Sequence, residues 1–160
     1  MPKKSKITSK KNDKKKDQEA NAPEVKKDKG EKEKPSAPSG GKKRCILIVE
    51  DERPLAHALE LKFAHEGFEP HIALDGEQAI DLMKKHKSVA ILLDLIMPNM
   101  DGFTFLEELK KKKSKIPVVI LTNLGQSEDE QRAMDLGAKG YFVKSNTPIF
   151  DIVKHVKTIL

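Results

Sequence analysis

Five polar residues occupy positions from which they could act together on a phosphoryl group. They lie at or just beyond the ends of short apolar runs, and they are Glu50, Asp51, Asp94, Thr122 and Lys144. Carboxylates held close together repel one another and raise each other's pKa values, so the three acidic residues would need compensation. Either a bound hard cation or protonation of one carboxyl group would supply it. Mg²⁺ fits the first solution, because it prefers carboxylate and water ligands and also binds phosphate oxygens.

A site of this kind would make Asp94 a nucleophile toward phosphorus. A carboxylate alone attacks a phosphate dianion poorly, because both groups are negative. A bridging cation and the ammonium of Lys144 would compensate the charge on the transferring group, and the hydroxyl of Thr122 could hold another phosphoryl oxygen. The product would be an aspartyl phosphate on Asp94, with Glu50 and Asp51 on the metal side.

The elements that must position these residues can be predicted from the apolar pattern. Near-continuous apolar runs, typical of strands covered on both faces, occupy 45–49, 89–93, 116–121 and 141–143, with a weaker candidate at 68–74. Helical spacing of apolar residues is found at 53–66, 76–87, around 103–109, at 127–136 and at 148–160. The order is strand then helix, repeated, which predicts a mostly parallel α/β sheet with helices on both faces. A ligand site is then expected beyond the carboxyl ends of the strands, where the five polar residues lie.

Charge divides the chain into two unequal parts. Residues 1–44 hold 16 Lys and Arg against 7 Asp and Glu, whereas the remaining 116 residues hold 15 against 18. The first part has almost no bulky apolar residues, so it cannot bury enough surface to offset its conformational entropy. We therefore predict a disordered Lys-rich tail and linker over 1–43 and one folded domain over 44–160.

Two roles are open for this tail. It could be a solvating extension, or it could be weakly attracted to nucleic acid or to an anionic membrane surface. Its scattered acidic residues and lack of aromatic residues argue against a specific nucleic-acid reader. Within the domain, the run Lys110–Lys113 is expected to end the third helix and to favour its dipole.

Cysteine usage and hydropathy indicate a cytoplasmic protein. Cys45 is the only cysteine, so the chain can form no internal disulfide and no metal site built on several thiolates. The basic N-terminus is not followed by an apolar segment of the kind found in secretory signals. No run approaches the roughly 18 apolar residues that a membrane span requires.

Four motifs, in this order, resemble landmarks of the receiver domain of bacterial two-component response regulators. They are V-E-D-E (49–52), L-D-L-I-M-P-N-M-D-G (93–102), V-I-L-T (119–122) and G-A-K-G-Y-F-V-K (137–144). The resemblance covers about residues 44–160. It implies a doubly wound, flavodoxin-like (βα)5 fold with a five-stranded parallel sheet in the order 2-1-3-4-5.

The resemblance also implies roles for individual residues. Asp94 would accept phosphate from a histidine kinase or phosphotransfer protein, and Thr122 and Tyr141 would shift together on phosphorylation. Asp51, helped by Glu50 and by the backbone carbonyl of Ile96, would hold Mg²⁺ together with Asp94. Such a domain catalyses only its own phosphorylation and dephosphorylation, and it is a signalling module rather than a metabolic enzyme.

Four positions depart from the family pattern or are unusual within it. Ser145 replaces the proline that usually follows the lysine, and Asn123 stands where a smaller residue is common. Ile96 and Leu124 flank the expected phosphoryl position, and neither can orient an attacking water. The phosphorylated form is therefore expected to be long-lived.

No output domain is expected after the fifth helix, so the module would act through a separate protein partner. Homodimerisation on phosphorylation is a further expectation, because the last helix is rich in apolar residues. Two alternatives remain: the tail is itself the effector, or the domain is a scaffold that never turns over phosphate. An aspartyl-phosphate hydrolase is disfavoured, since such enzymes usually carry a second aspartate where Ile96 stands.

Overall fold

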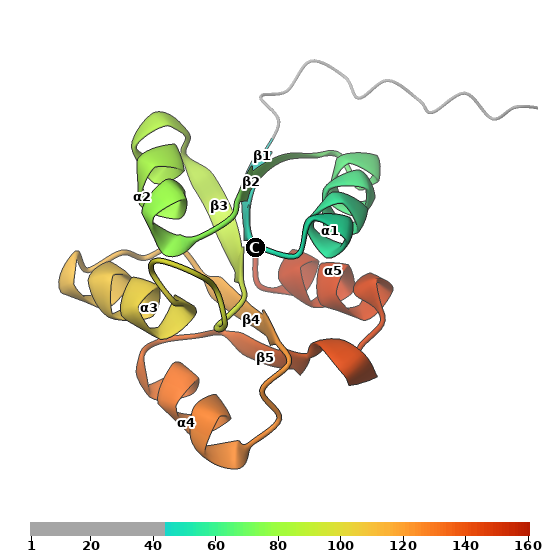
Figure 1. Ribbon diagram of the computed structural model, residues 1–160. Coiled ribbons are helices and arrows are strands. Elements are labelled where there is room, and N and C mark those ends of the chain that lie inside the picture. The colour runs from blue at the N-terminus through green and yellow to red at the C-terminus, as the bar shows by residue number, and fades with distance from the viewer. Residues whose placement is uncertain (1–43) are drawn as a thin grey trace, which may run out of the picture. The chain divides into compact units, whose positions relative to one another are not determined.

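The computed structural model describes residues 44–160, which alternate five strands with five helices (Figure 1). In chain order the elements are β1 (Arg44–Val49), α1 (Arg53–His65), β2 (Phe68–Ala73), α2 (Gly76–Lys85), β3 (Ser88–Leu93), α3 (Gly102–Lys111), β4 (Val118–Thr122), α4 (Ser127–Asp135), β5 (Gly140–Val143) and α5 (Ile149–Thr158). A single 3-10 turn, Lys144–Asn146, joins β5 to α5. The weaker strand candidate at 68–74 is thus confirmed as β2.

The strands form one parallel sheet in the order β2-β1-β3-β4-β5, which confirms the predicted doubly wound fold. Register matters most where β1 and β3 meet, because Val49 pairs with Leu93 at their carboxyl ends. The backbone N–H of Asp94 donates to the carbonyl of Val49 at 2.9 Å. The residues that follow the two strands, Glu50 and Asp94, are therefore held as neighbours.

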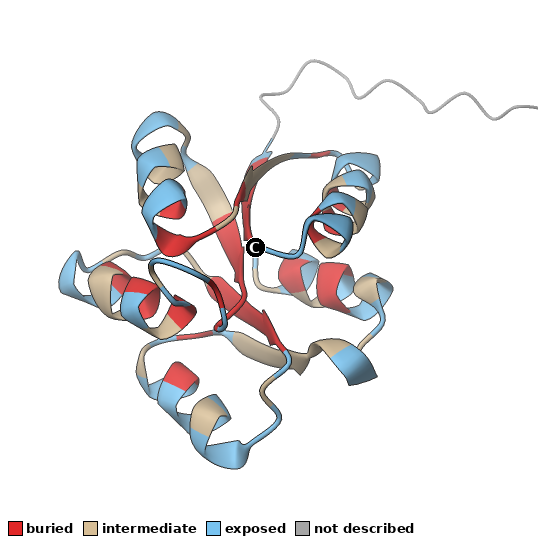
Figure 2. Cartoon of the chain, viewed as in Figure 1, coloured by how far each residue is buried: buried red, intermediate tan, exposed pale blue. Residues whose placement is uncertain are grey.

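The core consists of two apolar layers, one on each face of the sheet (Figure 2). Successive β1 side chains alternate between them, so that Leu47 packs beneath α2, α3 and α4 while Ile46 packs beneath α1 and α5. Every residue from Cys45 to Val49 and from Val118 to Thr122 is buried. Burying one large aliphatic side chain stabilises a fold by about 1.5–3 kcal/mol, so the central strands are a rigid base for the loops at their ends.

Aspartate side chains cap the first turns of α2 and α3. Asp75 caps α2 by accepting the backbone N–H of Gln78 at 2.8 Å, and Asp101 caps α3 through Thr104 at the same distance. Lysines occupy the last turns of both helices, as expected for side chains that complement the negative end of a helix dipole.

The predicted tail over 1–43 lies outside the described residues. Among residues 44–160, no helix is both long and apolar enough to cross a membrane.

Candidate functional site

The carboxyl edge of the sheet gathers the acidic residues that the sequence placed after β1 and β3. Ligand oxygens of Glu50, Asp51 and Asp94 all lie within 4.8 Å of one another. Glu50 and Asp94 are buried, with 2% and 3% of their surface exposed, whereas Asp51 is exposed. The predicted convergence of three carboxylates is present in the structure.

Lys144 reaches into this cluster from the end of β5. Its ammonium lies 2.6 Å from Oδ2 of Asp94 and 2.8 Å from Oε1 of Glu50, and its side chain is only 8% exposed. A third carboxylate, Glu52, also accepts from the ammonium at 2.8 Å. The sequence had suggested a cation or a proton as the compensating charge, and the structure adds this lysine as a third means of compensation.

Burial and these ion pairs change the pKa values of the site. Burial raises the pKa of Glu50 to about 7, even though the hydrogen bond and charge of Lys144 act in the opposite direction. Burial alone would lower the pKa of Lys144, but its bonds to Asp94, Glu50 and Glu52 outweigh burial and raise it. Lys144 is therefore charged at every physiological pH, while Glu50 titrates close to neutrality.

The donor set suits a hard divalent cation. Three carboxylates from two adjacent strand ends offer only oxygen ligands, which Mg²⁺ prefers. The exposed side of Asp51 leaves room for the waters that Mg²⁺ usually retains. Glu50, Asp51 and Asp94 are thus able to hold such an ion with its charge largely neutralised.

The loop after β3 is shaped around Asp94. The backbone N–H of Ile96 donates to Oδ1 of Asp94 at 3.1 Å, and the N–H of Gly102 donates to the carbonyl of Leu95 at 3.1 Å. A Cβ on Gly102 would overlap the carbonyl oxygen of Asp94 and lie 2.7 Å from Cα of Leu95. Only glycine allows this close approach, so position 102 sets how the loop leaves the phosphoacceptor candidate.

Asp75, the cap residue of α2, holds the same loop against that helix. Its buried carboxylate accepts the amide Nδ2 of Asn99 at 2.9 Å, in addition to the main chain and side chain of Gln78. The backbone N–H of Gln78, with these other donors, lowers the pKa of Asp75. Asn99 has a φ of 60°, a left-handed conformation that Asn tolerates better than most residues. In the sequence, the only signal of this contact was the turn-like composition of the segment, with Asn99 between Pro98 and the pair Asp101-Gly102.

Thr122 and Tyr141 are linked through a single intervening residue. Thr122 is fully buried, and its Oγ1 accepts the backbone N–H of Leu124 at 3.4 Å. The hydroxyl of Tyr141 donates to the carbonyl of Leu124 at 3.0 Å, and burial raises its pKa to about 12. Thr122 and Tyr141, which are expected to move together, are therefore hydrogen-bonded to the N–H and the carbonyl of Leu124.

The remaining positions singled out in the sequence lie around the rim. Ile96 is 54% exposed, and both Asn123 and Ser145 are exposed. Ser145 lies within the 3-10 turn that begins at Lys144. Glu52 was not predicted to contact Lys144. It follows the acidic pair by one residue and is the N-cap residue of α1.

Comparison with known proteins gives a consistent result. Residues 46–157 match the family model described as the response regulator receiver domain. The chain is similar to the probable transcriptional regulator ycf27 of Cyanophora paradoxa, with 37% identity over 106 residues, covering 66% of this chain and 44% of that protein. It is also 35% identical over 117 residues to the probable transcriptional regulator ycf29 of Porphyra purpurea, covering 72% and 56% respectively. The chain therefore spans about half the length of these curated relatives.

Solved structures show the same likeness over most of their length. The receiver domain of the Francisella response regulator 1452 superposes with a TM-score of 0.69 at 27% identity, covering 72% of this chain and 95% of that one. The chemotaxis protein CheY4 of Vibrio cholerae gives a TM-score of 0.69 at 25% identity, covering 74% and 100%. With the fold, the strand order and the family match in agreement, this chain belongs to the response regulator receiver domain family, whose members act in phosphorylation-dependent signalling.

Proposed function

We propose that Asp94 accepts a phosphoryl group in a Mg²⁺-dependent reaction, with a histidine kinase or phosphotransfer protein as donor. The main support is the contact of one buried ammonium, that of Lys144, with both Asp94 and Glu50. A lysine so placed compensates the charge of an attacking carboxylate and of the group that it attacks. Asp51, beside them, completes an acidic cluster suited to a divalent ion.

In the proposed step, an Oδ atom of Asp94 bonds to phosphorus as the bond from phosphorus to the donor atom breaks. The donor atom leaves with that electron pair, and the product is an aspartyl phosphate on Asp94. Lys144 would exchange a carboxylate partner for a phosphoryl oxygen; Glu52, the exposed partner, is the one most easily released. Thr122 would donate its hydroxyl to a second phosphoryl oxygen.

Mg²⁺ would be held by Glu50, Asp51, Asp94 and the backbone carbonyl of Ile96. When bound, it supplies positive charge to the phosphoryl oxygens during transfer. The loop that carries Ile96 is anchored by Gly102 and by the contact of Asn99 with Asp75, so the protein fixes the position of that carbonyl in advance.

The output would be a change in the surface around α4 and β5, read by a separate protein partner. Drawing Thr122 toward the phosphoryl group would weaken its bond to Leu124, and Leu124 also holds the hydroxyl of Tyr141. A pre-existing two-state equilibrium would then be shifted rather than a new shape created. The domain would turn over no substrate beyond its own phosphoryl group. A cytoplasmic location suits its free, buried thiol at Cys45.

Slow hydrolysis of the phosphorylated form is part of this proposal. Ile96 follows Asp94 by two residues and Leu124 follows Thr122 by two, and neither apolar side chain can hydrogen-bond an attacking water. Ile96→Asn should therefore speed the loss of phosphate severalfold. Leu61→Asn, at an exposed apolar position on α1, is a matched control and should decay at the wild-type rate. Equal decay rates in wild type and Ile96→Asn would refute this part.

Phosphorylation by acetyl phosphate, followed by intact-protein mass spectrometry, tests the main proposal. We expect one added phosphoryl group that requires Mg²⁺ and is lost in the Asp94→Ala variant. The absence of any adduct in folded protein, with acetyl phosphate and phosphoramidate alike, would favour a phosphate-independent scaffold instead.

A further inference from the structure

Lysines of the domain concentrate at the amino edge of the sheet, opposite the site described above. In a parallel sheet the helix-to-strand connections lie at this edge. Three of them, taken with the adjoining ends of the helices and of β3, cover residues 84–88, 110–117 and 135–139, between α2 and β3, α3 and β4, and α4 and β5. Together these segments contain nine lysines and one carboxylate, that of Asp135. The rest of 45–160 holds six Lys and Arg against 17 Asp and Glu, so the domain is strongly polarised.

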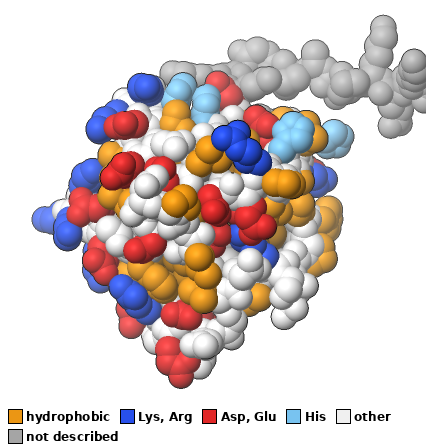
Figure 3. All heavy atoms as spheres, in the orientation of Figure 1, with side chains coloured by type: hydrophobic (Ala, Val, Ile, Leu, Met, Phe, Trp, Pro, Cys, Tyr) orange, Lys and Arg blue, Asp and Glu red, His pale blue; other side chains and the backbone are white. Residues whose placement is uncertain are grey.

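We name these nine lysines the lysine edge, and all of them are exposed. Its members are Lys84, Lys85, Lys87, Lys110, Lys111, Lys112, Lys113, Lys115 and Lys139. Figure 3 shows Lys and Arg side chains at the margin of the molecule beside α2 and α3, interspersed there with acidic side chains.

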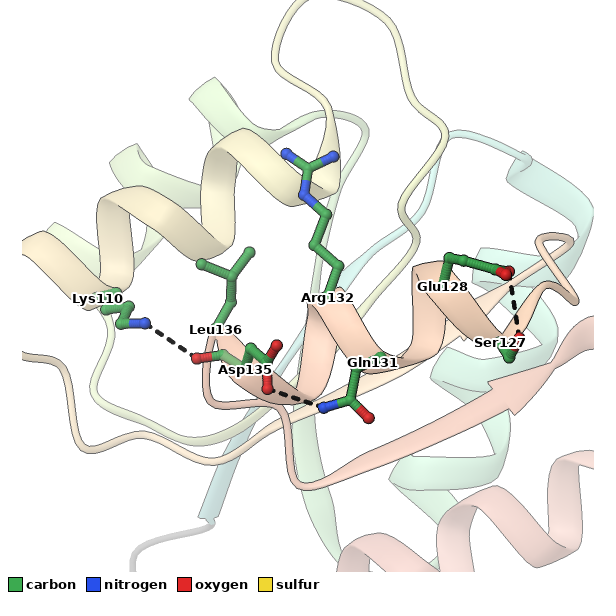
Figure 4. Close-up of a pocket in the computed structure, with 7 residues that line it drawn as sticks. All are labelled: Lys110, Ser127, Glu128, Gln131, Arg132, Asp135 and Leu136. Atoms are coloured by element: carbon green, nitrogen blue, oxygen red, sulfur yellow. Dashed lines mark hydrogen bonds between the residues drawn. The ribbon is translucent and has the colours of Figure 1, made fainter.

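The lysine edge is continuous from one helix to the next. A groove of about 150 Å³ between α2 and α3 is lined by Lys84 and Lys112. A second groove, of about 290 Å³, lies between the ends of α3 and α4 and is lined by Lys110 and Lys113. Lys110 also crosses this gap to donate to the carbonyl of Asp135 at 3.0 Å (Figure 4). The ends of three helices thus present neighbouring lysines, of which Lys84 and Lys111 are paired with Asp81 and Glu108 at 2.8 Å.

Helix stabilisation does not account for this many cations. Lysines in the last turn of a helix complement its dipole, which explains Lys84 and Lys85 on α2 and Lys110 and Lys111 on α3. The effect falls off beyond that turn, yet five further lysines follow the helix ends. Lys113 even adopts a φ of 51°, a conformation in which glycine or asparagine is favoured. A lysine at that position points to a use for its charge.

We propose that the lysine edge binds the phosphate backbone of a nucleic-acid duplex without reading its sequence. Such binding requires exposed cations spread over a surface, and it needs neither base contacts nor a pocket. The large exposed apolar residues of 44–160 are Leu61, Ile96, Met134, Phe150 and Leu160, and none lies in the three connections. Their absence from these connections disfavours an amphipathic membrane surface and a single-strand binder that stacks bases on aromatic side chains.

The position of β1 adds to this surface. Arg44, an exposed residue at which the described chain begins, starts β1 at the same edge of the sheet. The preceding 43 residues contain 15 of the 31 Lys and Arg of the chain. By sequence, therefore, the most basic segment of the protein is covalently joined to its most basic folded edge.

The test compares two triple variants of the full chain for binding to a short mixed-sequence DNA duplex. K85Q/K112Q/K113Q removes three lysines of the lysine edge that form no ion pair within residues 44–160. K62Q/K154Q/K157Q removes three from α1 and α5, of which Lys62 and Lys157 both pair with Glu66. Because both lose the same charge and both keep residues 1–43, any difference between them reports on the lysine edge. Neither variant alters the phosphoacceptor site, so the result is independent of phosphorylation.

Dissociation constants would be measured over a range of KCl concentrations. Affinity depends on salt with a slope of about −0.9 per neutralised phosphate, so the first variant should lower the slope by about 2–3 and weaken binding about tenfold or more at low salt. The second should stay within about twofold of wild type, and K85R/K112R/K113R should bind like wild type. Equal weakening by both glutamine variants, or no duplex binding by the wild type, would overturn the proposal. Tighter binding to phosphatidylserine vesicles than to the duplex, with the same variant dependence, would overturn it in favour of a membrane surface.

Discussion

The two edges of the sheet use the same residue type in opposite ways. At the carboxyl edge, Lys144 is 8% exposed and bonded to three carboxylates at 2.6–2.8 Å. At the amino edge, Lys112, Lys113 and Lys139 are exposed, and within residues 44–160 none of them forms an ion pair. The chemistry of the side chain is identical, so the difference lies entirely in its surroundings.

Exposure to solvent determines how strongly each of these charges contributes to the stability of the fold. Charges at the surface interact weakly with one another, because water and salt screen them. Charges held in a poorly solvated cluster interact strongly, and removing one partner leaves the others uncompensated. A lysine at the carboxyl edge should therefore be indispensable to its neighbours, whereas lysines at the amino edge should matter only collectively and to a partner. The following predictions test that contrast, from the largest expected effect to the smallest.

Removing one lysine from each edge should give very different losses of stability. Lys144→Gln leaves Glu50 and Asp94 buried without their shared cation, which typically costs about 3–5 kcal/mol in the free energy of unfolding. Lys139→Gln, at the amino edge, should change it by less than about 0.5 kcal/mol. Urea denaturation in the absence of divalent ions measures both. Similar losses in the two variants would show that the site does not depend on its lysine.

Stability should fall with rising pH because of Glu50. Its pKa is raised by burial from 4.5 to about 7, so the folded protein retains a proton there that the unfolded chain has released. The resulting stabilisation is complete below pH 4.5 and is lost as the pH rises through about 7. In metal-free buffer the loss should amount to about 3 kcal/mol.

Glu50→Gln tests this effect, because it removes the titrating carboxyl group while keeping the shape of the side chain. The difference in free energy of unfolding between wild type and Glu50→Gln should vary with pH between about pH 4.5 and 7, and Mg²⁺ should reduce the dependence on the alkaline side. A difference that is constant over this range would mean that Glu50 titrates normally.

Substituting alanine for glycine should cost more stability in the loop after β3 than in an open loop. Gly102→Ala would place a methyl group against the backbone of Asp94 and Leu95, whereas Gly125→Ala would meet no atom within 4 Å. We expect the first to lower the free energy of unfolding by about 2–3 kcal/mol, as overpacking does, and the second to be nearly neutral. Thermal unfolding of the two variants provides the comparison. Equal melting temperatures would indicate that the loop after β3 can relax.

Removing the caps of α2 and α3 should give a smaller difference in the free energy of unfolding. Asp75→Ala removes the cap of α2 and also leaves Asn99 without its acceptor, so about 1–2 kcal/mol should be lost. Asp101→Ala removes the exposed cap of α3, a contact within its own first turn, and should cost about 1 kcal/mol or less. Only the Asp75 variant should also slow phosphorylation, since it frees the loop that carries Ile96. Unchanged phosphorylation in that variant would remove Asp75 from the positioning of the site.

The sequence predicted the parallel sheet and the convergence of Glu50, Asp51, Asp94 and Lys144, because both follow from where apolar runs end. In a parallel sheet those ends share an edge, so residues distant in the chain are brought together by topology alone. The same reasoning could not find the bond between Glu52 and Lys144, or that between Asp75 and Asn99. These depend on side-chain reach and on the backbone conformation of single loop residues, which leave no periodic signal.

The grouping of the nine lysines at the lysine edge could not be predicted from the sequence either. Lys110–Lys113 was expected to favour the dipole of its helix, and the last-turn lysines do occupy that position. That this run faces a groove shared with α2, and that other lysines lie at the same edge, emerges only from the packing of the helices. Counting charges along the sequence therefore does not show which lysines become neighbours in the folded domain.

The central claim, that Asp94 receives the phosphoryl group, is tested most directly by locating the modification. After phosphorylation with acetyl phosphate and Mg²⁺, reduction by borohydride converts an aspartyl phosphate into homoserine, which peptide mass spectrometry identifies by position. The account predicts homoserine at position 94 alone, and none when Mg²⁺ is withheld. Homoserine at position 51, or an unmodified Asp94 in protein that has gained phosphate, would contradict it.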